Sequence, residues 1–387
     1  MLFDPSEAQY MIWTPLEFIP KKSLGIDVGT SAIKIVELSR WGERIKLENY
    51  GEISAQALYQ KPFRTFEKST LLLFAEDISR AIKAIMDEAK IKACRTVFSI
   101  PDFSSFFTSF ELPPMTREEL PQAVRYEARQ YVPLPPAEVT LDWQIIEGEV
   151  ASQRKAKLKI LLVAVPNEII NQYRKIAEIS GLELFALEAE VFGLLRSLIG
   201  EEKRTLILVD IGAQSTTCSI IEKRVLKMSY SFDMAGNEFT ATLSKGLGID
   251  YKEAKELKEK YGILASSVAE GPATEGEESK LSSSPFAVAR EVREMLLPLV
   301  DVILKEIEKI SQNLYLTEGK EVQKFFLAGA SAYLPGLKEY FEDYFKKEIE
   351  IANPFSNIFY PPILEKTLKE MGSSYAIAVG MALRGLE

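Results

Sequence analysis

The sequence predicts an α/β protein of two lobes, and three observations carry this prediction. An apolar run that ends in Asp and Gly, followed by hydroxyl residues and a second apolar run, occurs twice, as SLGIDVGTSAIKIVEL and LILVDIGAQSTTCSII. Strand patterns and amphipathic helical patterns alternate along much of the remaining chain. The length of 387 residues, with 47% apolar content, exceeds one ordinary hydrophobic core.

Each copy of the repeated motif reads as a strand, a tight polar turn and a returning strand. Glycine has no Cβ, so such a turn lets backbone N–H groups and Ser/Thr hydroxyls approach an anion, while the preceding carboxylate can hold hydrated Mg²⁺. Two such turns facing each other would bind a polyphosphate from both sides. One copy alone is equally well explained as an ordinary hairpin, because Asp and Gly favour turns; the two copies together favour a nucleotide site.

Composition excludes several classes of function. The net charge of -9 and the absence of a basic stripe argue against a nucleic-acid partner. The chain has no His, which excludes a Ser-His-Asp triad, a His-bearing zinc site and a phosphohistidine. The first twenty residues lack Lys and Arg and are interrupted by Pro, so we expect neither a signal peptide nor a membrane anchor. Cys94 and Cys218 lie in strand-like stretches and are expected to be buried thiols of a cytoplasmic protein.

After the first hairpin we expect the strand RIKLENYGEI and a helix in the amphipathic run TLLLFAEDISRAIKAIMDEAK. A second unit follows, with strands TVFSIP and FTSFELP. Its first helix, in TREELPQAVRYEARQ, opens on the capping-box pair Thr116 and Glu119, and Pro121 means that this helix either bends or begins later. Strands LDWQII and KLKILLVAVP and helix NEIINQYRKIAEISG complete this unit, and GEVASQRKAK is expected to be a solvated hairpin loop.

The segment LELFALEAEVFGLLRSL is expected to turn from strand into helix before the second hairpin. Helix is expected after Asn237 through EAKELKEKYG, then an exposed mobile loop in AEGPATEGEESKLSSSP and a long helix from about Phe286 to Leu316. FFLAGASAYLPGLKEYFEDYF reads as a buried strand, a small-residue turn and a helix, and SSYAIAVGMALRGL as a final apolar helix.

The order of these motifs resembles the actin-like ATPase superfamily. The shared features are the two Asp-Gly hairpins, the inserted unit, the connecting helix, the EAKELKEKYG helix, the Gly turn with LPGL and the last Ala/Gly-rich helix. The segments RYEARQYVPLPPAEVTLDWQII and ILLVAVPNEIINQYRKIAEISGLE look specifically like the PilM version of the inserted subdomain, with the division protein FtsA as the related branch. The implied fold has two lobes, each a mixed sheet flanked by helices, with an FtsA/PilM-type inserted subdomain.

The resemblance implies the following division of the chain. The parts are an N-terminal lead (1–20), a first-lobe subdomain 1A (21–92), an inserted subdomain 1C (93–185), a connecting helix (186–200), a second lobe with subdomains 2A and 2B (201–364) and a C-terminal helix that returns to the first lobe (365–387). The stretch MIWTPLEF within the lead has no assigned role.

The resemblance also implies a site for ATP and Mg²⁺ between the lobes. Asp27 and Asp210 would hold Mg²⁺ through water, and Lys34 would neutralise phosphate charge, although an exposed strand Lys explains it equally well. The other implied nucleotide contacts are Gly29, Thr30 and Ser31 in the first turn; Gly212, Ala213, Gln214, Ser215 and Thr216 in the second; Gly236 and Asn237 near the ribose; and Lys258, Gly329, Ala330 and Ser331 on the adenosine side.

Two positions depart from the family pattern. Lys255 stands where a ribose-binding Glu is expected, with Glu256 displaced by one position, and Ala330 stands where a second Gly is usual. For hydrolysis, Glu188 or Glu190 corresponds to the residue that orients the attacking water, while at least one of them reads equally as a helix-start carboxylate. At most a slow ATPase is expected, with ATP fixing the angle between the lobes.

Partners are implied by the resemblance alone. PilM-like proteins bind the cytoplasmic N-terminal segment of the inner-membrane protein PilN, which would place this chain at the inner face of the membrane as a pilus-assembly scaffold, with self-association possible. Tyr131 to Pro136 would border the binding groove or form a simple connecting loop. The alternatives are an FtsA-like scaffold, which would need a basic amphipathic membrane helix, a small-molecule kinase of the superfamily, and a scaffold of the type II secretion kind that has lost nucleotide binding.

Overall fold

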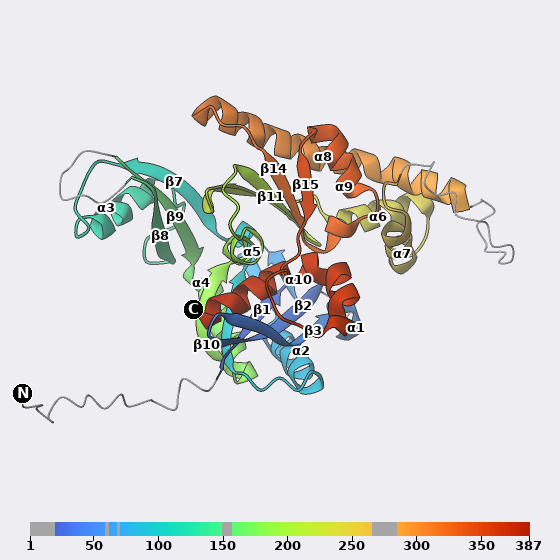
Figure 1. The fold of residues 1–387 in the computed structure, drawn as a ribbon, viewed down its shortest axis with the longest axis horizontal. Helices are drawn as coiled ribbons and strands as arrows, with labels where there is room; N and C mark the ends of the chain where they lie inside the picture. The colour runs from blue at the N-terminus through green and yellow to red at the C-terminus, as the bar shows by residue number, and fades with distance from the viewer. Residues whose placement is uncertain (1–19, 59–61, 68–69, 149–156, 265–284) are drawn as a thin grey trace, which may run out of the picture.

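Two five-stranded mixed sheets form the two lobes of the computed structural model, which describes residues 20–58, 62–67, 70–148, 157–264 and 285–387 (Figure 1). The predictions for the N-terminal lead, for the loop GEVASQRKAK and for the loop AEGPATEGEESKLSSSP fall largely outside these residues. Figure 1 shows the first lobe below, the second lobe above and a smaller sheet beside them. The predicted α/β fold of two lobes is confirmed.

The first-lobe sheet has the strand order β10-β6-β1-β2-β3. Its strands are β1 (Lys21–Val28), β2 (Ala32–Trp41), β3 (Arg44–Ser54), β6 (Arg95–Ile100) and β10 (Glu183–Ala189). Strands β1, β6 and β10 run parallel, whereas β1, β2 and β3 are antiparallel hairpins. Helices α2 (Ala75–Glu88) and α4 (Asn167–Ser180) cover one face of this sheet through Ile78, Ile82 and Ile176. Helix α1 (Ala55–Leu58) and the hairpin of β4 (Arg64–Glu67) and β5 (Thr70–Leu73) follow β3.

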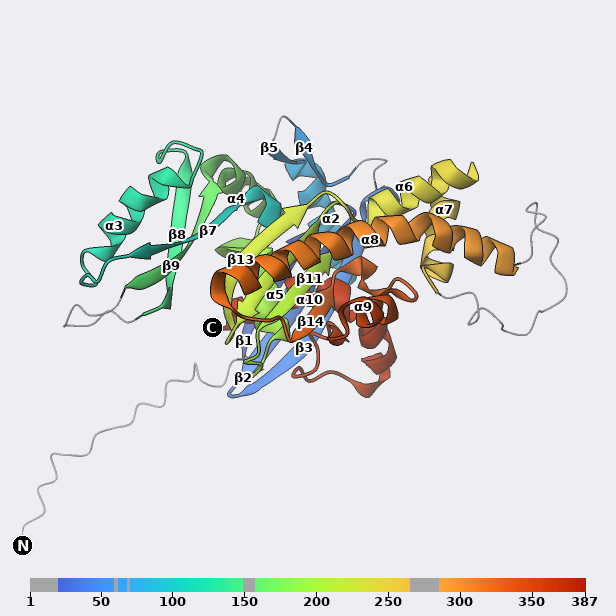
Figure 2. The same cartoon turned by 90° about the horizontal axis from the view of Figure 1, so that it is seen from above.

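The second-lobe sheet has the strand order β13-β12-β11-β14-β15. Its strands are β11 (Leu206–Ile211), β12 (Thr216–Glu222), β13 (Val225–Phe232), β14 (Lys324–Ala328) and β15 (Glu348–Ile351). Helices α6 (Gly236–Leu247), α7 (Tyr251–Tyr261), α8 (Pro285–Glu318) and α9 (Leu337–Phe345) pack on its outer face, where Ile207 and Val209 of β11 point. Figure 2 shows α8 running the length of this lobe.

Two helices fill the space between the lobes. These are helix α5 (Glu190–Leu198) and helix α10 (Glu365–Leu386), which follows the 3₁₀ turn η6 (Pro362–Leu364). Both helices pack on the inner face of the second sheet, where Leu206 and Leu208 lie. Helix α10 also covers the inner face of the first sheet. An added Cβ on Gly380 of α10 would lie 2.0 Å from the carbonyl oxygen of Gly193 on α5, so the two backbones are in contact. Helix α10 therefore contacts both lobes.

The inserted module is smaller than predicted. It holds β7 (Phe106–Leu112), β8 (Val139–Glu147), β9 (Leu158–Pro166) in the order β7-β9-β8, helix α3 (Leu120–Glu127) and the turn η4 (Ala128–Gln130). The segment TVFSIP, placed in this module from sequence, is β6, and both of its faces are buried because it lies between β1 and β10. The range 93–185 therefore includes β6, α4 and part of β10, which belong to the first lobe.

Three local predictions are corrected. TLLL is strand β5, and helix α2 begins only at Ala75. The connecting helix begins at Glu190 because residues 183–189 pair with β6. Helix α3 begins at Leu120, which is the later start that Pro121 allows, and the capping-box bonds between Thr116 and Glu119 form as expected. Cys94 is exposed, whereas Cys218 is buried as predicted.

The region after Asn237 forms two helices, because Gly248 takes a left-handed conformation (φ 66°) between α6 and α7. The side chain of Asp250 then accepts a 2.8 Å hydrogen bond from the backbone N–H of Glu253 and caps α7. Among the described helices, none is long and apolar enough to cross a bilayer.

Candidate functional site

Carboxylates gather where the parallel strands of the first lobe end. Asp27 lies near the end of β1, Asp102 follows β6 in the 3₁₀ turn η3 (Asp102–Ser104), and Glu190 follows β10. Side chains alternate along a strand, so Asp27 lies on the same face as Gly25, the face that α10 covers. Ser99 of β6 donates a 2.8 Å hydrogen bond to Asp27. The carboxyl ends of strands are the usual ligand edge of such sheets.

The second lobe supplies a matching edge. Asp210 shares its face of β11 with Leu206 and Leu208, which point toward the first lobe, and it pairs with Ala328 of the parallel strand β14. Gly329 follows β14 with φ 85° and ψ 171°, and a Cβ there would lie 2.5 Å from Asp210 Oδ1. Only glycine fits this position without strain. Asp27 and Asp210 are therefore both turned toward the space between the lobes.

The two Asp-Gly turns meet directly. Thr30 Oγ1 donates a 3.2 Å hydrogen bond to Gln214 Oε1, across 184 positions of sequence. Both turns are closed hairpins, because the backbone N–H of Gly29 donates to Ala32 and that of Gly212 donates to Ser215. Lys34 is opposite Asp27 in the pairing of β1 with β2. Its positive charge acts to lower the pKa of Asp210, but burial and nearby negative charges raise that pKa by more. The fold thus brings the predicted residues of both turns together.

Arg64 links these turns to the carboxylates. Its Nε lies 3.4 Å from Thr30 Oγ1, and its guanidinium donates to Glu190 Oε1 at 3.1 Å. The second oxygen of Glu190 accepts from the backbone N–H of Asp102 at 3.4 Å, and Asp102 Oδ1 accepts from Val191 N. A continuous chain of polar contacts therefore runs from the second-lobe turn to the start of α5.

Negative charge exceeds positive charge in this buried cluster. Four carboxylates, those of Asp27, Asp102, Glu190 and Asp210, face the cations of Arg64 and Lys34. Burial raises the pKa of Asp210 to about 7, with further increases from the charges of Glu190 and Asp27. Burial and Glu190 likewise raise the pKa of Asp102 well above its usual value. Asp102 Oδ2 is buried and has no hydrogen-bond partner among the described residues.

The residues predicted to lie on the adenosine side also come together. The ammonium of Lys258 donates to the carbonyl of Gly236 (3.0 Å) and to Thr240 Oγ1 (2.9 Å), and burial lowers its pKa to about 8. Ser331 Oγ donates to the carbonyl of Gly212 at 3.4 Å, and the backbone N–H of Gly236 donates to the same carbonyl at 3.1 Å. Lys258 therefore anchors the start of α6 beside the second turn.

Further backbone contacts extend this arrangement. Asn237 N donates to the carbonyl of Ala213 (2.8 Å), and Thr216 Oγ1 donates to the carbonyl of Met234 (2.5 Å). Ala330 begins the 3₁₀ turn η5 (Ala330–Tyr333) directly after Gly329. In the first turn, the carbonyl of Ser31 accepts from Ala55 N.

Some predicted residues lie elsewhere. Glu188 makes a bidentate ion pair with Arg196, at 2.6 and 2.9 Å, next to the C-terminal residue Glu387. Lys255 and Glu256 are on the exposed face of α7, where Lys255 pairs with Glu259. Of the two glutamates considered for water positioning, only Glu190 belongs to the buried cluster.

Sequence reasoning missed Arg64, Asp102 and Ser99. Asp102 and Ser99 lie on or directly after TVFSIP, so pairing that strand with β1 would have placed both at the ligand edge. No local pattern singles out Arg64, because β4 is a short strand whose position depends on the tertiary fold.

The residues present fit a divalent cation. The cluster has four carboxylates and two cationic side chains, and the buried Asp102 Oδ2 has no hydrogen-bond partner among the described residues. Mg²⁺ binds carboxylate oxygens and retains water, so it would balance this charge. Glycine is required by the close packing of both turns, because a Cβ on Gly29, Gly212 or Gly329 would lie within 3.0 Å of a neighbouring oxygen atom. Turns packed in this way can present backbone N–H groups to an anion.

Comparisons with known families agree with this architecture. Residues 25–269 match the family described as type IV pilus assembly protein PilM, and residues 207–380 match that of cell division protein FtsA. FtsA of Staphylococcus epidermidis (strain RP62A) is 23% identical over 230 residues, which cover 59% of this chain and 49% of that protein, about half its length. FtsA of Enterococcus faecalis is 21% identical over 356 residues, covering 86% of this chain and 78% of that protein.

Solved structures show the same fold. The PilM-PilN type IV pilus biogenesis complex has a TM-score of 0.77 at 22% identity, covering 94% of this chain and 98% of that chain. The ethanolamine utilization protein EutJ from Carboxydothermus hydrogenoformans has a TM-score of 0.55 at 15% identity, with coverage of 95% and 91%. Because the first family match spans more than half of the sequence, the chain belongs to the PilM family of type IV pilus assembly proteins, within the actin-like ATPase superfamily.

Proposed function

We propose that this protein is an ATP-binding scaffold of the type IV pilus assembly platform. The observation that carries the proposal is the Thr30–Gln214 hydrogen bond, because it joins the two Asp-Gly turns from opposite lobes at the place where a polyphosphate would contact both. Phosphate oxygens entering there would replace this bond with contacts to the hydroxyls and N–H groups of both turns. Nucleotide binding would then link the lobes.

Asp27 and Asp210 would hold Mg²⁺ through water, and Mg²⁺ would neutralise phosphate charge. Lys34 and Arg64 would add the remaining positive charge, since both act on the carboxylate cluster. Gly236, Lys258 and the turn after Gly329 would border the nucleoside, a role supported by their contacts with the second turn.

We propose slow turnover at most. Both oxygens of Glu190 are engaged, one by Arg64 and the other by the backbone N–H of Asp102, so neither is available to orient a water molecule without rearrangement. ATP would act mainly as a conformational ligand that selects one angle between the lobes.

The proposed partner is the cytoplasmic N-terminal segment of PilN. Family membership supports this partner, and so does the solved PilM-PilN complex, in which a protein of the same fold is paired with PilN. Binding to PilN would hold the protein at the inner face of the inner membrane. The Tyr131 to Pro136 stretch, within the inserted module, presents the half-exposed ring of Tyr131, which stacks on Phe110 with 5.4 Å between the ring centroids.

Equilibrium titration of the purified protein with Mg-ATP tests the nucleotide site. We expect saturable binding that Asp210→Asn weakens at least tenfold, while the matched variant Asp87→Asn, on the exposed face of α2, binds like wild type. A second titration measures a PilN N-terminal peptide with and without Mg-ATP. Equal ATP affinity in wild type and Asp210→Asn would refute the proposed site, and absence of peptide binding would refute the proposed partner.

A further inference from the structure

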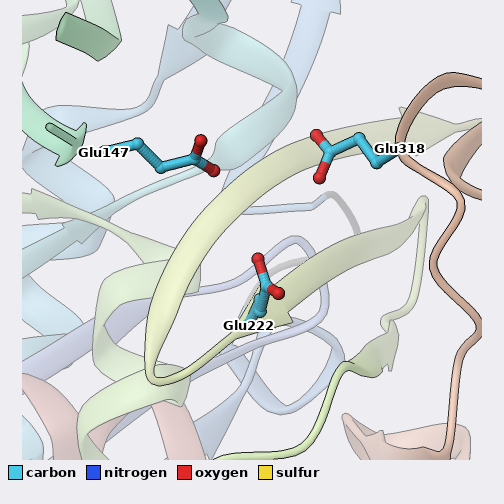
Figure 3. A group of neighbouring side chains, drawn as sticks. All are labelled: Glu147, Glu222 and Glu318. Atoms are coloured by element: carbon cyan, nitrogen blue, oxygen red, sulfur yellow. The ribbon is translucent and has the colours of Figure 1, made fainter. Parts of the chain in front are cut away.

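Six charged side chains meet at the boundary between the inserted module and the second lobe. Figure 3 shows three of them, Glu147, Glu222 and Glu318, whose carboxylates reach toward one space from separate elements. Lysines lie between them. The six residues, called the charge ring below, are Glu147 of β8, Lys159 of β9, Glu222 of β12, Lys227 of β13, Glu318 at the end of α8 and Lys320 directly after it.

The ion pairs of the charge ring form a closed circuit. Lys227 Nζ lies 2.5 Å from Glu147 and 3.5 Å from Glu222. Lys320 Nζ lies 2.9 Å from both Glu222 and Glu318. Lys159 Nζ lies 2.9 Å from Glu318 and 3.9 Å from Glu147, which closes the circuit.

The charge ring is an ion-pair network and carries no metal site. The three carboxylates lie within 4.8 Å of one another, a spacing that could hold a cation. Each carboxylate, however, already lies between two ammonium groups, and the six charges cancel. Burial would raise the pKa of Glu318, but hydrogen bonds from Lys159 and Lys320 outweigh that effect and lower it to about 2.

Two β-bulges aim residues into the charge ring. In β13 the register passes from Met228 to Leu226, which leaves Lys227 as the extra residue, and its side chain is only 7% exposed. In β8 the register passes from Ile145 to Glu147, so this bulge lies directly before Glu147, which is a residue of the charge ring. A bulge bends a strand and redirects a side chain, so each strand departs from regular pairing at the point where the two parts meet.

The charge ring spans two parts of the protein that the chain does not join directly. Glu147 and Lys159 belong to the inserted module, whose covalent connections, through β6 and α4, lead to the first lobe. The other four residues belong to the second lobe. Beside the charge ring, Leu161 of the module packs in one cluster with Leu226 of β13. The module is thus attached covalently to one lobe, and by ion pairs together with apolar packing to the other.

We propose that the charge ring is a latch that makes the inserted module follow the second lobe when the angle between the lobes changes. The lobes also meet through α5 and α10, which lie between the two sheets, and through the hydrogen bond between Thr30 and Gln214. A rotation of the second lobe therefore either tilts the module against the first lobe or opens the ion pairs. The idea that nucleotide drives this rotation rests on the proposed function. The attachment of the module to the second lobe does not.

Distances between spin labels test the attachment without nucleotide. Label positions are Arg125→Cys on α3 and Lys245→Cys on α6, both exposed, in a Cys94→Ser background. We expect one narrow distance distribution, which Glu147→Gln broadens because it removes the carboxylate between two lysines.

The matched control for the latch is Glu111→Gln, which removes an exposed 2.7 Å ion pair with Lys157 inside the module and should leave the distribution narrow. Raising the salt to 1 M, where the Debye length is about 3 Å, should broaden the wild-type distribution without any mutation. Unchanged widths in both Glu147→Gln and high salt would overturn the latch.

Labels on the module and the first lobe, at Arg125→Cys and Lys83→Cys of α2, test the coupling. We expect bound Mg-ATP to shift this distance in the otherwise wild-type protein, and we expect the shift to be lost in Glu147→Gln although nucleotide still binds. A shift of equal size in both proteins, or none with ATP bound, would overturn the coupling. Failure of ATP to bind would instead refute the proposed function and leave the nucleotide-free result standing.

Discussion

Replacing Asp210 by Asn should stabilise the metal-free protein at neutral and alkaline pH. The substitution preserves shape and removes a buried charge that lies close to Glu190 and Asp27. Burial and these two charges raise the pKa of Asp210 from 3.8 to about 7. A shift of about three units corresponds to about 4 kcal/mol of free energy of unfolding.

The sign of this effect depends on pH. At a pH below the pKa that Asp210 has in the unfolded chain, Asp210 is neutral in both the folded and the unfolded chain, and it does not lower the free energy of unfolding. As the pH rises toward the folded pKa, the unfolded chain loses its proton first, so the free energy of unfolding falls, and the full cost is present above about pH 7. About 2 kcal/mol of the cost should develop between about pH 5.5 and pH 7.

Urea denaturation in EDTA at several pH values between 5.5 and 8 measures this effect. The advantage of Asp210→Asn over wild type should grow as the pH rises from 5.5 to about 7 and then level off, whereas the exposed control Asp87→Asn should follow wild type throughout. An advantage that stays constant with pH, or a variant less stable than wild type at pH 8, would refute the assignment of Asp210 to a crowded carboxylate cluster. Adding Mg²⁺ should narrow the difference, because a cation compensates the charge in wild type.

Three further substitutions probe packing around the site by urea denaturation. Arg64→Met should cost about 3–5 kcal/mol, since it leaves the buried carboxylate of Glu190 unpaired, and Glu190→Gln in the same chain should recover part of the loss. Gly329→Ala should cost about 2 kcal/mol or more, because φ is 85° and the Cβ would lie 2.5 Å from Asp210 Oδ1. Gly380→Ala should cost about 1–3 kcal/mol, because its Cβ would press α10 against α5.

Each of these three predictions has its own control. Gly181→Ala combines a φ of 73° with open space around the Cβ, so it isolates the conformational cost, and Gly329→Ala must exceed it. Gly372→Ala, on the same helix as Gly380, meets nothing closer than 3.4 Å and should be tolerated. The assignment of a buried ion pair would be wrong if Glu190→Gln worsened the Arg64→Met protein.

Local sequence patterns predicted most elements because their signals are local. The repeated Asp-Gly hairpins, the long helix α8 and the capping box at Thr116 depend on alternation, helical period or short-range hydrogen bonds. The pairing of TVFSIP with β1 was missed because its partners in β1 and β10 lie about 70 and about 90 residues away along the chain, and an apolar run does not specify its neighbours. The inserted module was therefore drawn too large.

The sequence by itself determined which residues carry the two turns, and its resemblance to a known superfamily implied that Asp27 and Asp210 belong to one site between the lobes. Only the tertiary structure decided that Arg64 and Asp102 join them, that Glu190 rather than Glu188 belongs to the cluster, and that β-bulges close a charge ring at the module boundary. The physical reason is the distance along the chain over which each kind of interaction acts. Turn and strand preferences act over a few residues, whereas a buried charge is stabilised by partners that distant segments bring within hydrogen-bond distance.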